Sequence, residues 1–128
     1  MTKWTDEELR RVGEAEELHL ASARRDGTMR RYVTMWVVRV GDDLYVRSAY
    51  GPDNPWFRRA KASGAGLIRA GGLERDVAFA EPVPGVHAGI DAAYHAKYDR
   101  YGPGIVATVV GPDTEAVTIR LVPRSTSS

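Results

Sequence analysis

Residues 24–72 decide the fold of this chain, and they read RRDGTMRRYVTMWVVRVGDDLYVRSAYGPDNPWFRRAKASGAGLIRAGG. Two short turns, Arg-Asp-Gly at 25–27 and Gly-Asp-Asp at 41–43, separate three runs with the pattern of β-strands. The third run ends in a loop rich in Gly, Pro and Asn. A helix is expected from Pro55 onward, because proline is favoured as the first residue of a helix. The segment therefore predicts an antiparallel β-meander with a helix at its rim.

The middle run, residues 31–40, is largely apolar on both faces of the expected strand. One face carries Tyr32, Thr34, Trp36, Val38 and Val40, and the other carries Arg31, Val33, Met35, Val37 and Arg39. A strand that is apolar on both faces is normally covered on both faces. The pattern therefore predicts that residues 31–40 form one central strand.

The remaining elements follow from the same kinds of signal. A capping box at Thr5–Glu8 predicts a short N-terminal helix. Further strands are expected at 18–23, 67–70, 73–80 and 116–122, and further helices at 55–63 and 86–101; residues 105–110 suit either state. Six or seven short strands joined mainly by tight turns, with two to three helices, predict an α+β fold with a mostly antiparallel, closed or half-closed barrel. One domain is expected over residues 1–124, with a disordered tail at 125–128.

Composition narrows the functional classes. The 128 residues carry a net charge of +1, which provides no strong overall field to attract nucleic acid or a membrane. The chain has no cysteine, so thiol catalysis, disulfides and thiolate metal sites are excluded. The three histidines lack metal-ligand spacing, and no metal is expected. No signal peptide or membrane-spanning run is recognised, so a cytoplasmic location is expected.

Four arginines converge in the predicted topology: Arg31, Arg47, Arg58 and Arg59. Arg58 and Arg59 lie near the start of a helix, where the helix dipole favours anions rather than cations. A bound anion such as phosphate explains these positive side chains. Exposed ion pairs to Asp53, Glu74 or Asp76 explain them equally well.

A second candidate feature is an aromatic stripe on the helix at 86–101. Ile90, Tyr94, Tyr98 and Tyr101 recur at helical spacing, which normally indicates packing on a core. Buried phenol groups need hydrogen-bond partners, and three in one stripe are unusual. A cleft lined by aromatic rings for a planar ligand is therefore the other interpretation, and both remain open.

The sequence also resembles known proteins. Residues 23–49 and 50–79 are similar to the split-barrel flavin-binding proteins, particularly the branch of deazaflavin-dependent nitroreductases. The whole chain resembles a small bacterial family known as a domain of unknown function. That family shares Val-Thr-x-Trp-Val-Val-Arg-Val (33–40), Tyr-Val-Arg-Ser (45–48) and Ala-Ala-Tyr-His-x-Lys-Tyr (92–98). The resemblance implies a split β-barrel of the FMN-binding-like type.

The resemblance also implies roles for individual residues. Arg31 corresponds to the hairpin arginine that contacts the cofactor phosphate. Ser48, Tyr50 and Gly51 lie in the turn that faces the ring and ribityl chain, and Trp56 is the helix aromatic. The sequence departs from the pattern at Asp26, at Thr34 in place of a proline, and at Ala49 in place of a basic residue that adjacent Arg47 is a candidate to replace.

Together these features favour a flavin- or deazaflavin-binding oxidoreductase-like protein of unknown substrate, with FMN or the deazaflavin coenzyme as cofactor. A homodimer is expected, as in other split barrels. The expected cofactor-binding residues are Arg31, Thr34, Arg47, Ser48, Tyr50, Gly51, Trp56, Arg58, Tyr94 and Tyr98. Lys97 and Tyr98 are the candidate proton donors, although no catalytic residue is assigned.

Two other interpretations compete with an oxidoreductase. The first is a non-catalytic split-barrel module that binds a small anionic ligand or a cofactor. The second is a barrel that binds RNA or DNA through arginines and exposed aromatic rings, and the near-zero net charge argues against it.

Overall fold

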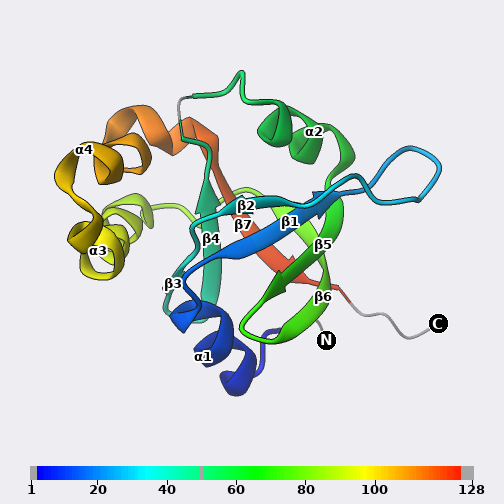
Figure 1. Cartoon of the computed structure of the whole chain (residues 1–128), viewed down its shortest axis with the longest axis horizontal. Helices are drawn as coiled ribbons and strands as arrows, with labels where there is room; N and C mark the ends of the chain where they lie inside the picture. The colour runs from blue at the N-terminus through cyan, green and yellow to red at the C-terminus, as the bar shows by residue number, and fades with distance from the viewer. Residues whose placement is uncertain (1–2, 50, 125–128) are drawn as a thin grey trace.

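The computed structural model describes residues 3–49 and 51–124 (Figure 1). Its seven strands form one antiparallel sheet in the order β2-β1-β5-β6-β7-β4-β3. The strands are β1 (Leu18–Ser22), β2 (Val33–Met35), β3 (Val38–Val40), β4 (Asp43–Arg47), β5 (Ala65–Ala70), β6 (Leu73–Ala80) and β7 (Thr118–Pro123). The two end strands, β2 and β3, are consecutive in the chain, so the curled sheet closes into a split β-barrel. The α+β split-barrel prediction is confirmed.

Helices cover the barrel at several places (Figure 1). The longer ones are α1 (Asp6–Glu14), α2 (Pro55–Ser63) and α3 (His87–Tyr98), and the short ones are η1 (Asp99–Tyr101), α4 (Pro103–Val106), η2 (Ala107–Val109) and η3 (Pro112–Val117). The predicted capping box of α1 is present, because the Thr5 hydroxyl accepts from the Glu8 amide at 3.1 Å and the Glu8 carboxylate accepts from the Thr5 amide at 2.9 Å. No helix within the described residues is long and apolar enough to cross a membrane.

Two apolar clusters lie on opposite sides of β4. Leu44 and Val46 point into the barrel interior, where they pack with residues of α1 and α2 such as Leu9 and Phe57. Tyr45 belongs to the second cluster, which lies under α3 and α4. Every residue from Leu44 to Ser48 is buried, as expected for a strand covered on both faces.

The prediction of one central strand at 31–40 is wrong. Residues 33–35 pair with β1 and residues 38–40 pair with β4, so Trp36 and Val37 belong to neither ladder. Tyr32 and Val33 remain 36% and 37% exposed. The apolar pattern of this run reflects a chain that changes partners at a kink, and only its second half is covered.

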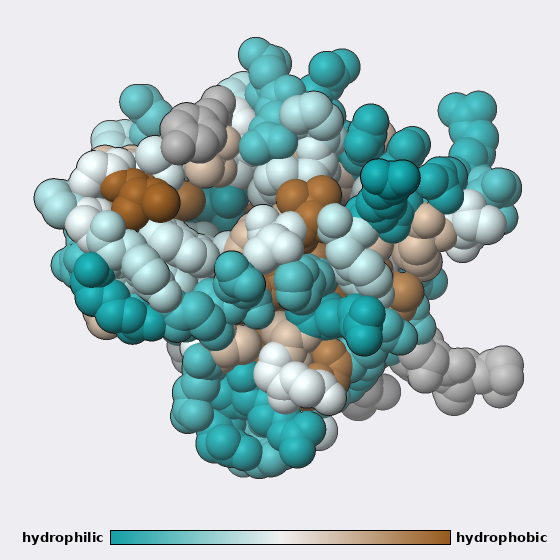
Figure 2. Space-filling model, in the orientation of Figure 1, coloured by the Kyte–Doolittle hydropathy of each residue, from teal (hydrophilic) through white to brown (hydrophobic). Residues whose placement is uncertain are grey.

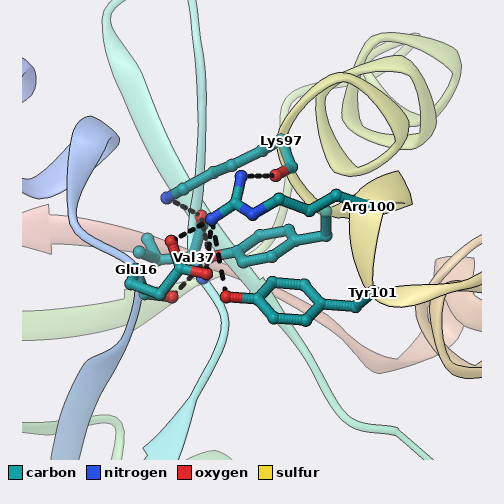
Figure 3. A network of polar contacts seen from close by, with 6 residues as sticks. Glu16, Val37, Lys97, Arg100 and Tyr101 are labelled. Carbon is teal, nitrogen blue, oxygen red and sulfur yellow. Dashed lines mark hydrogen bonds and ion pairs between the residues drawn. The ribbon is translucent and has the colours of Figure 1, made fainter.

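Helix α3 fixes the kink through the backbone of Val37 (Figure 3). The Tyr98 hydroxyl accepts from the Val37 amide at 3.2 Å, and it lies 2.9 Å from the carbonyl oxygen of Glu16 and 3.1 Å from that of Val37. Lys97 donates to the same Val37 carbonyl at 2.7 Å. Arg100 holds the Glu16 carboxylate by an ion pair. The backbone amide and carbonyl of Val37, which the kink removes from the ladders, are thus satisfied by side chains.

Other local predictions had mixed outcomes. The helix predicted at 55–63 has those bounds, and α3 with η1 covers most of the helix predicted at 86–101. Residues 105–110, which suited either state, lie largely in α4 and η2 and are helical. The strand predicted at 116–122 begins at Thr118, because η3 occupies the residues before it. The predicted tail at 125–128 lies outside the described residues.

We expect Tyr98→Phe to lower the free energy of unfolding by about 1–3 kcal/mol, because it leaves the buried amide of Val37 without its acceptor, while Lys97 still donates to the Val37 carbonyl. Urea denaturation measures the effect. Tyr101→Phe is the matched control, since Tyr101 is 49% exposed and its removal should change stability by less than about 0.5 kcal/mol. Equal effects of the two substitutions would contradict the role of Tyr98 in holding the Val37 backbone.

Lys97 predicts a pH dependence of stability. Burial lowers the pKa of Lys97 from 10.5 to about 8, with Glu16 raising it and Arg100 lowering it further. Between these two values the unfolded chain binds the proton that the folded chain has lost, so stability should rise with pH. Relative to Lys97→Met, the wild type should gain no more than about 2 kcal/mol, because solvent screens this partly exposed amine. Urea denaturation from pH 7 to 10.5 tests this, and a difference that falls with pH would refute it.

Candidate functional site

An apolar cleft lies between the open edge of β2, the start of α2 and the α4–η2 segment. Its volume is about 340 Å³. Its lining residues are Val33, Thr34, Met35, Trp36, Arg47, Ala49, Asn54, Trp56, Ile105, Thr108 and Val109. In Figure 1, α2 and α4 stand on either side of the upper end of β4, and β2 crosses in front of it. The cleft thus opens beside the kinked strand, where the barrel is split.

Aromatic rings form part of this cleft. Trp36 stacks on Tyr98 with the ring centroids 4.0 Å apart and the planes at 7°, and the Tyr101 ring lies 5.6 Å from Trp36. Trp56 is buried and meets Phe57 edge-on at 5.9 Å. These contacts fix both indoles, so the cleft has rigid apolar walls suited to a flat ligand.

Among the described residues that line the cleft, Arg47 is the one with an ionisable side chain. Its Nε donates to the Thr118 hydroxyl at 2.9 Å, and its Nη1 donates to the Val109 carbonyl at 2.9 Å and forms an ion pair with Asp91. Its Nη2 lies 3.2 Å from Nδ1 of His87. The guanidinium is buried and bonded on most sides, so its positive charge is held in a fixed position.

A second hollow of about 870 Å³ lies on the other side of the first turn of α2. We call it the arginine basin, and its lining residues are Ala23, Arg24, Arg25, Arg30, Pro55, Arg58, Arg59, Ala62 and Ser63. Figure 2 shows strongly hydrophilic side chains gathered over α2 and the adjoining hairpin. Pro55 lines the basin whereas its neighbours Asn54 and Trp56 line the apolar cleft, so the two hollows flank the same helix start.

A tight hairpin turn brings three of these arginines to the basin. The Gly27 amide donates to the Arg24 carbonyl at 2.9 Å, and the Arg24 amide donates to the Thr28 carbonyl at 2.7 Å. Asp26 accepts from the amide and hydroxyl of Thr28, and the hydroxyl contact holds the pKa of Asp26 below its usual value. The acidic residue of the turn is thus engaged by Thr28.

The expected site residues fall into three groups. Thr34, Arg47 and Trp56 line the apolar cleft, and Arg58 lines the arginine basin. Ser48 is buried and donates to the Gly51 carbonyl at 2.8 Å, closing the loop after β4. Tyr50 lies outside the described residues.

Arg31 is exposed and lines neither hollow, whereas its neighbour Arg30 lines the basin. Successive residues of an extended chain point to opposite sides, so a shift of one residue changes which arginine reaches the basin. Among the described residues, no ion pair joins Arg31, Arg58 or Arg59 to Asp53, Glu74 or Asp76. That alternative explanation of their charge is therefore not supported.

Tyr94 and Tyr98 lie in the core with no exposed surface, and they line neither hollow. In the structure both rings therefore pack in the core, and their contact with a cofactor stays a prediction. Burial raises the pKa of Tyr94, and raises that of Tyr98 to about 12. Tyr98 does not line the cleft, but its ring stacks on Trp36, which does. Tyr101 ends the stripe at the surface.

Sequence reasoning missed several residues of the site. Arg24, Arg25 and Arg30 were not singled out, although they adjoin the predicted turn. Trp36 shares a face with Thr34 in the alternation, which was a usable signal. Asp91 follows His87 by four residues on the buried side of α3, and this polar pair indicates a buried partner. No cluster of three or more potential metal ligands occurs within residues 3–49 and 51–124.

Comparison with known protein families identifies the family of this chain. Residues 8–121 match the family described as "Uncharacterized protein conserved in bacteria (DUF2255)". The chain belongs to this family. No curated protein sequence matches this DUF2255 protein significantly.

Several solved structures share the fold of this DUF2255 protein. An F420 reductase has 23% identity and a TM-score of 0.57, covering 93% of each chain. A putative pyridoxamine 5'-phosphate oxidase from Listeria innocua has 18% identity and a TM-score of 0.64, covering 94% of this chain and 93% of that one. An FAD-binding protein from Mesorhizobium loti has 14% identity and a TM-score of 0.57, covering 96% and 92%. At these identities the likeness establishes the split-barrel fold.

The Arg47–Asp91 pair should behave as a coupled unit. We expect Arg47→Met to lower the free energy of unfolding by roughly 2–4 kcal/mol, because it leaves the Val109 carbonyl and the Asp91 carboxylate without the guanidinium, and only the Gly111 amide then donates to Asp91. Asp91→Asn in the same background should cost much less than in the wild type. A double-mutant cycle by urea denaturation measures the coupling, and additive effects would contradict it.

Proposed function

We propose that this protein binds a flavin or deazaflavin coenzyme and acts as an oxidoreductase on a substrate not yet identified. The observation that carries the proposal is the pairing of two hollows at the start of α2. One is an apolar cleft walled by Trp36 and Trp56, and the other is a basin lined by five arginines. The fold neighbours that are named as an F420 reductase and an FAD-binding protein support the same class of ligand.

The ring system of the coenzyme would lie in the apolar cleft. Flat aromatic walls favour a planar ligand, and the volumes of the two hollows fall within the usual range for small-molecule sites. Ala49 leaves room on the side of β4, and Thr34 and Asn54 offer polar groups at the margins. The loop closed by Ser48 and Gly51 would adjoin the ring, as the resemblance implies for these residues.

The phosphate would lie in the arginine basin. Guanidinium groups donate paired hydrogen bonds to phosphate oxygens, and Arg58 and Arg59 carry two of them on α2. Arg30 takes the place that the resemblance gives to Arg31. The coenzyme would thus cross the first turn of α2, from Trp56 to Arg58.

A flavin or deazaflavin supplies hydride transfer when it is bound. The residues of this chain would hold and orient it, exclude water from one face, and keep the guanidinium of Arg47, which is paired with Asp91, in a fixed position at the cleft wall. Lys97 and Tyr98 were the candidate proton donors, but their polar atoms are engaged with the Val37 backbone and neither lines the cleft.

A homodimer forms part of the proposal. Val33 and Ile105 lie on the cleft and are 37% and 48% exposed, so a second copy packed on this rim would bury them. Met35 is half-buried, whereas Val37, which shares the expected strand face with Val33 and Met35, is completely buried in the barrel interior. The candidate dimer surface is therefore smaller than the sequence pattern suggested.

A non-catalytic module that binds a small anionic ligand is the second candidate. The observation that favours it is the cleft lining, because Arg47 is the single ionisable side chain among its residues within 3–49 and 51–124 and is already bonded. A binding experiment with the coenzyme alone, followed by an assay for its reduction, separates this candidate from the oxidoreductase.

Titration with FMN and with the deazaflavin coenzyme, read by coenzyme fluorescence, tests the proposal. We expect saturable micromolar binding of at least one of them. Ala49→Leu should raise the dissociation constant about tenfold or more, because the added methyl groups occupy the cleft. Ala96→Leu is the matched control, since Ala96 is exposed on α3 and should leave binding unchanged.

Melting curves of both variants check that Ala49→Leu remains folded. Failure of both coenzymes to bind would overturn the oxidoreductase proposal. Binding that is indifferent to Ala49→Leu would place the ligand elsewhere. Binding without reduction by any hydride donor would favour the non-catalytic module.

A further inference from the structure

The arginine basin has little compensating negative charge. Its nine lining residues within the described part of the chain include Arg24, Arg25, Arg30, Arg58 and Arg59 but no carboxylate, and Asp26 of the adjoining turn attracts Arg24 without pairing with it. Arg24 donates to the hydroxyl of Thr28 and the carbonyl of Met29. The first turn of α2 has no acidic residue. Five positive charges therefore share one hollow, where their mutual repulsion opposes folding.

Outside the basin, seven of the thirteen lysine and arginine side chains in the described part of the chain form ion pairs, whereas none of the five in the basin does. Those in ion pairs with carboxylates are Arg10, Arg11, Arg47, Lys61, Arg69, Arg75 and Arg100. Lys61 is informative because it lies on α2 itself and pairs with Glu81 at 2.6 Å. The same helix thus carries a neutralised cation outside the basin and two unneutralised ones, Arg58 and Arg59, inside it.

The number of guanidinium groups bears on the charge of the ligand. A terminal phosphate carries about −1.5 to −2 charges and three acceptor oxygens, which one or two arginines satisfy. Five arginines offer far more donors than that group can use. The excess charge is matched by a ligand whose tail bears at least two anionic groups.

We propose that the arginine basin binds a polyanionic tail, so that the coenzyme is one with a diphosphate or a phosphate plus carboxylates rather than FMN. The identity of the coenzyme in this inference rests on the proposed function, which places the ring in the apolar cleft. The binding of polyanions in the basin does not depend on that function. Both candidate tails share the chemistry of several closely spaced anions. FAD represents the first, and the deazaflavin coenzyme with its glutamate carboxylates represents the second.

A nucleic acid is the less favoured polyanion. The five arginines of the basin are gathered in one hollow beside an apolar cleft, and the net charge of the chain is only +1. A strand of nucleic acid would require a longer basic track. A small molecule with a compact charged tail fits the geometry better.

The test compares four ligands on the full chain: riboflavin, FMN, FAD and the deazaflavin coenzyme. We expect FAD or the deazaflavin coenzyme to bind at least about tenfold more tightly than FMN, with a stronger dependence on salt. Arg58→Gln/Arg59→Gln should abolish that preference and leave riboflavin binding unchanged. Arg58→Lys/Arg59→Lys should restore part of it, because the charges remain.

The matched control is Arg10→Gln/Arg11→Gln, which also removes two consecutive arginines from an exposed helix and should change no affinity. A second readout uses inorganic tripolyphosphate, which should raise the melting temperature of the wild type and of this control. It should not stabilise the Arg58→Gln/Arg59→Gln variant. This readout needs no coenzyme.

The outcomes separate the two proposals. If tripolyphosphate stabilises the wild type through the basin and no coenzyme binds, the proposed function fails and the polyanion site stands. If FMN binds as tightly as FAD and the deazaflavin coenzyme, or if tripolyphosphate stabilises the basin variant equally, the polyanion inference is overturned. Tighter binding of a single-stranded oligonucleotide than of any coenzyme would also overturn it.

Discussion

The fold depends on how the chain passes Val37. On one side the strand pairs with β1 and on the other with β4, and between them two residues leave both ladders. Backbone groups freed inside a protein must find other partners or they destabilise it. Tyr98 and Lys97 of α3 provide those partners for Val37 from 61 and 60 residues away in sequence. This contact joins α3 to the seam of the barrel.

The contact between Tyr98 and the Val37 backbone also shapes the candidate site. Because Tyr98 is fixed by its hydroxyl, its ring offers a constant surface on which Trp36 stacks. Trp36 in turn forms one wall of the apolar cleft. Arg47 lies on the next strand and is held by Asp91 of the same helix. Helix α3 therefore positions both the aromatic wall formed by Trp36 and the charged wall formed by Arg47, although Tyr98 and Asp91 do not themselves line the cleft.

Local signals in the sequence predicted the elements well and their partners poorly. The capping box at Thr5 and the proline at residue 55 are short-range features, and the helices that they predicted are present. The strand at 31–40 was misjudged because an apolar pattern reports that residues are covered, not which strand covers them. The kink depends on Tyr98, which only the tertiary structure brings to Val37.

The candidate site was anticipated in kind but displaced in detail. Arginines and aromatic rings were both expected, yet Arg47 lies under the cleft and Arg31 outside both hollows. A turn that points Arg30 rather than Arg31 into the basin changes the identity of the residue without changing the chemistry. The separation of apolar walls from positive charges on two sides of one helix start arises from the packing of α2, and no pattern within a single segment encodes it. A ligand that satisfies both hollows must itself be divided into an apolar ring and a charged tail.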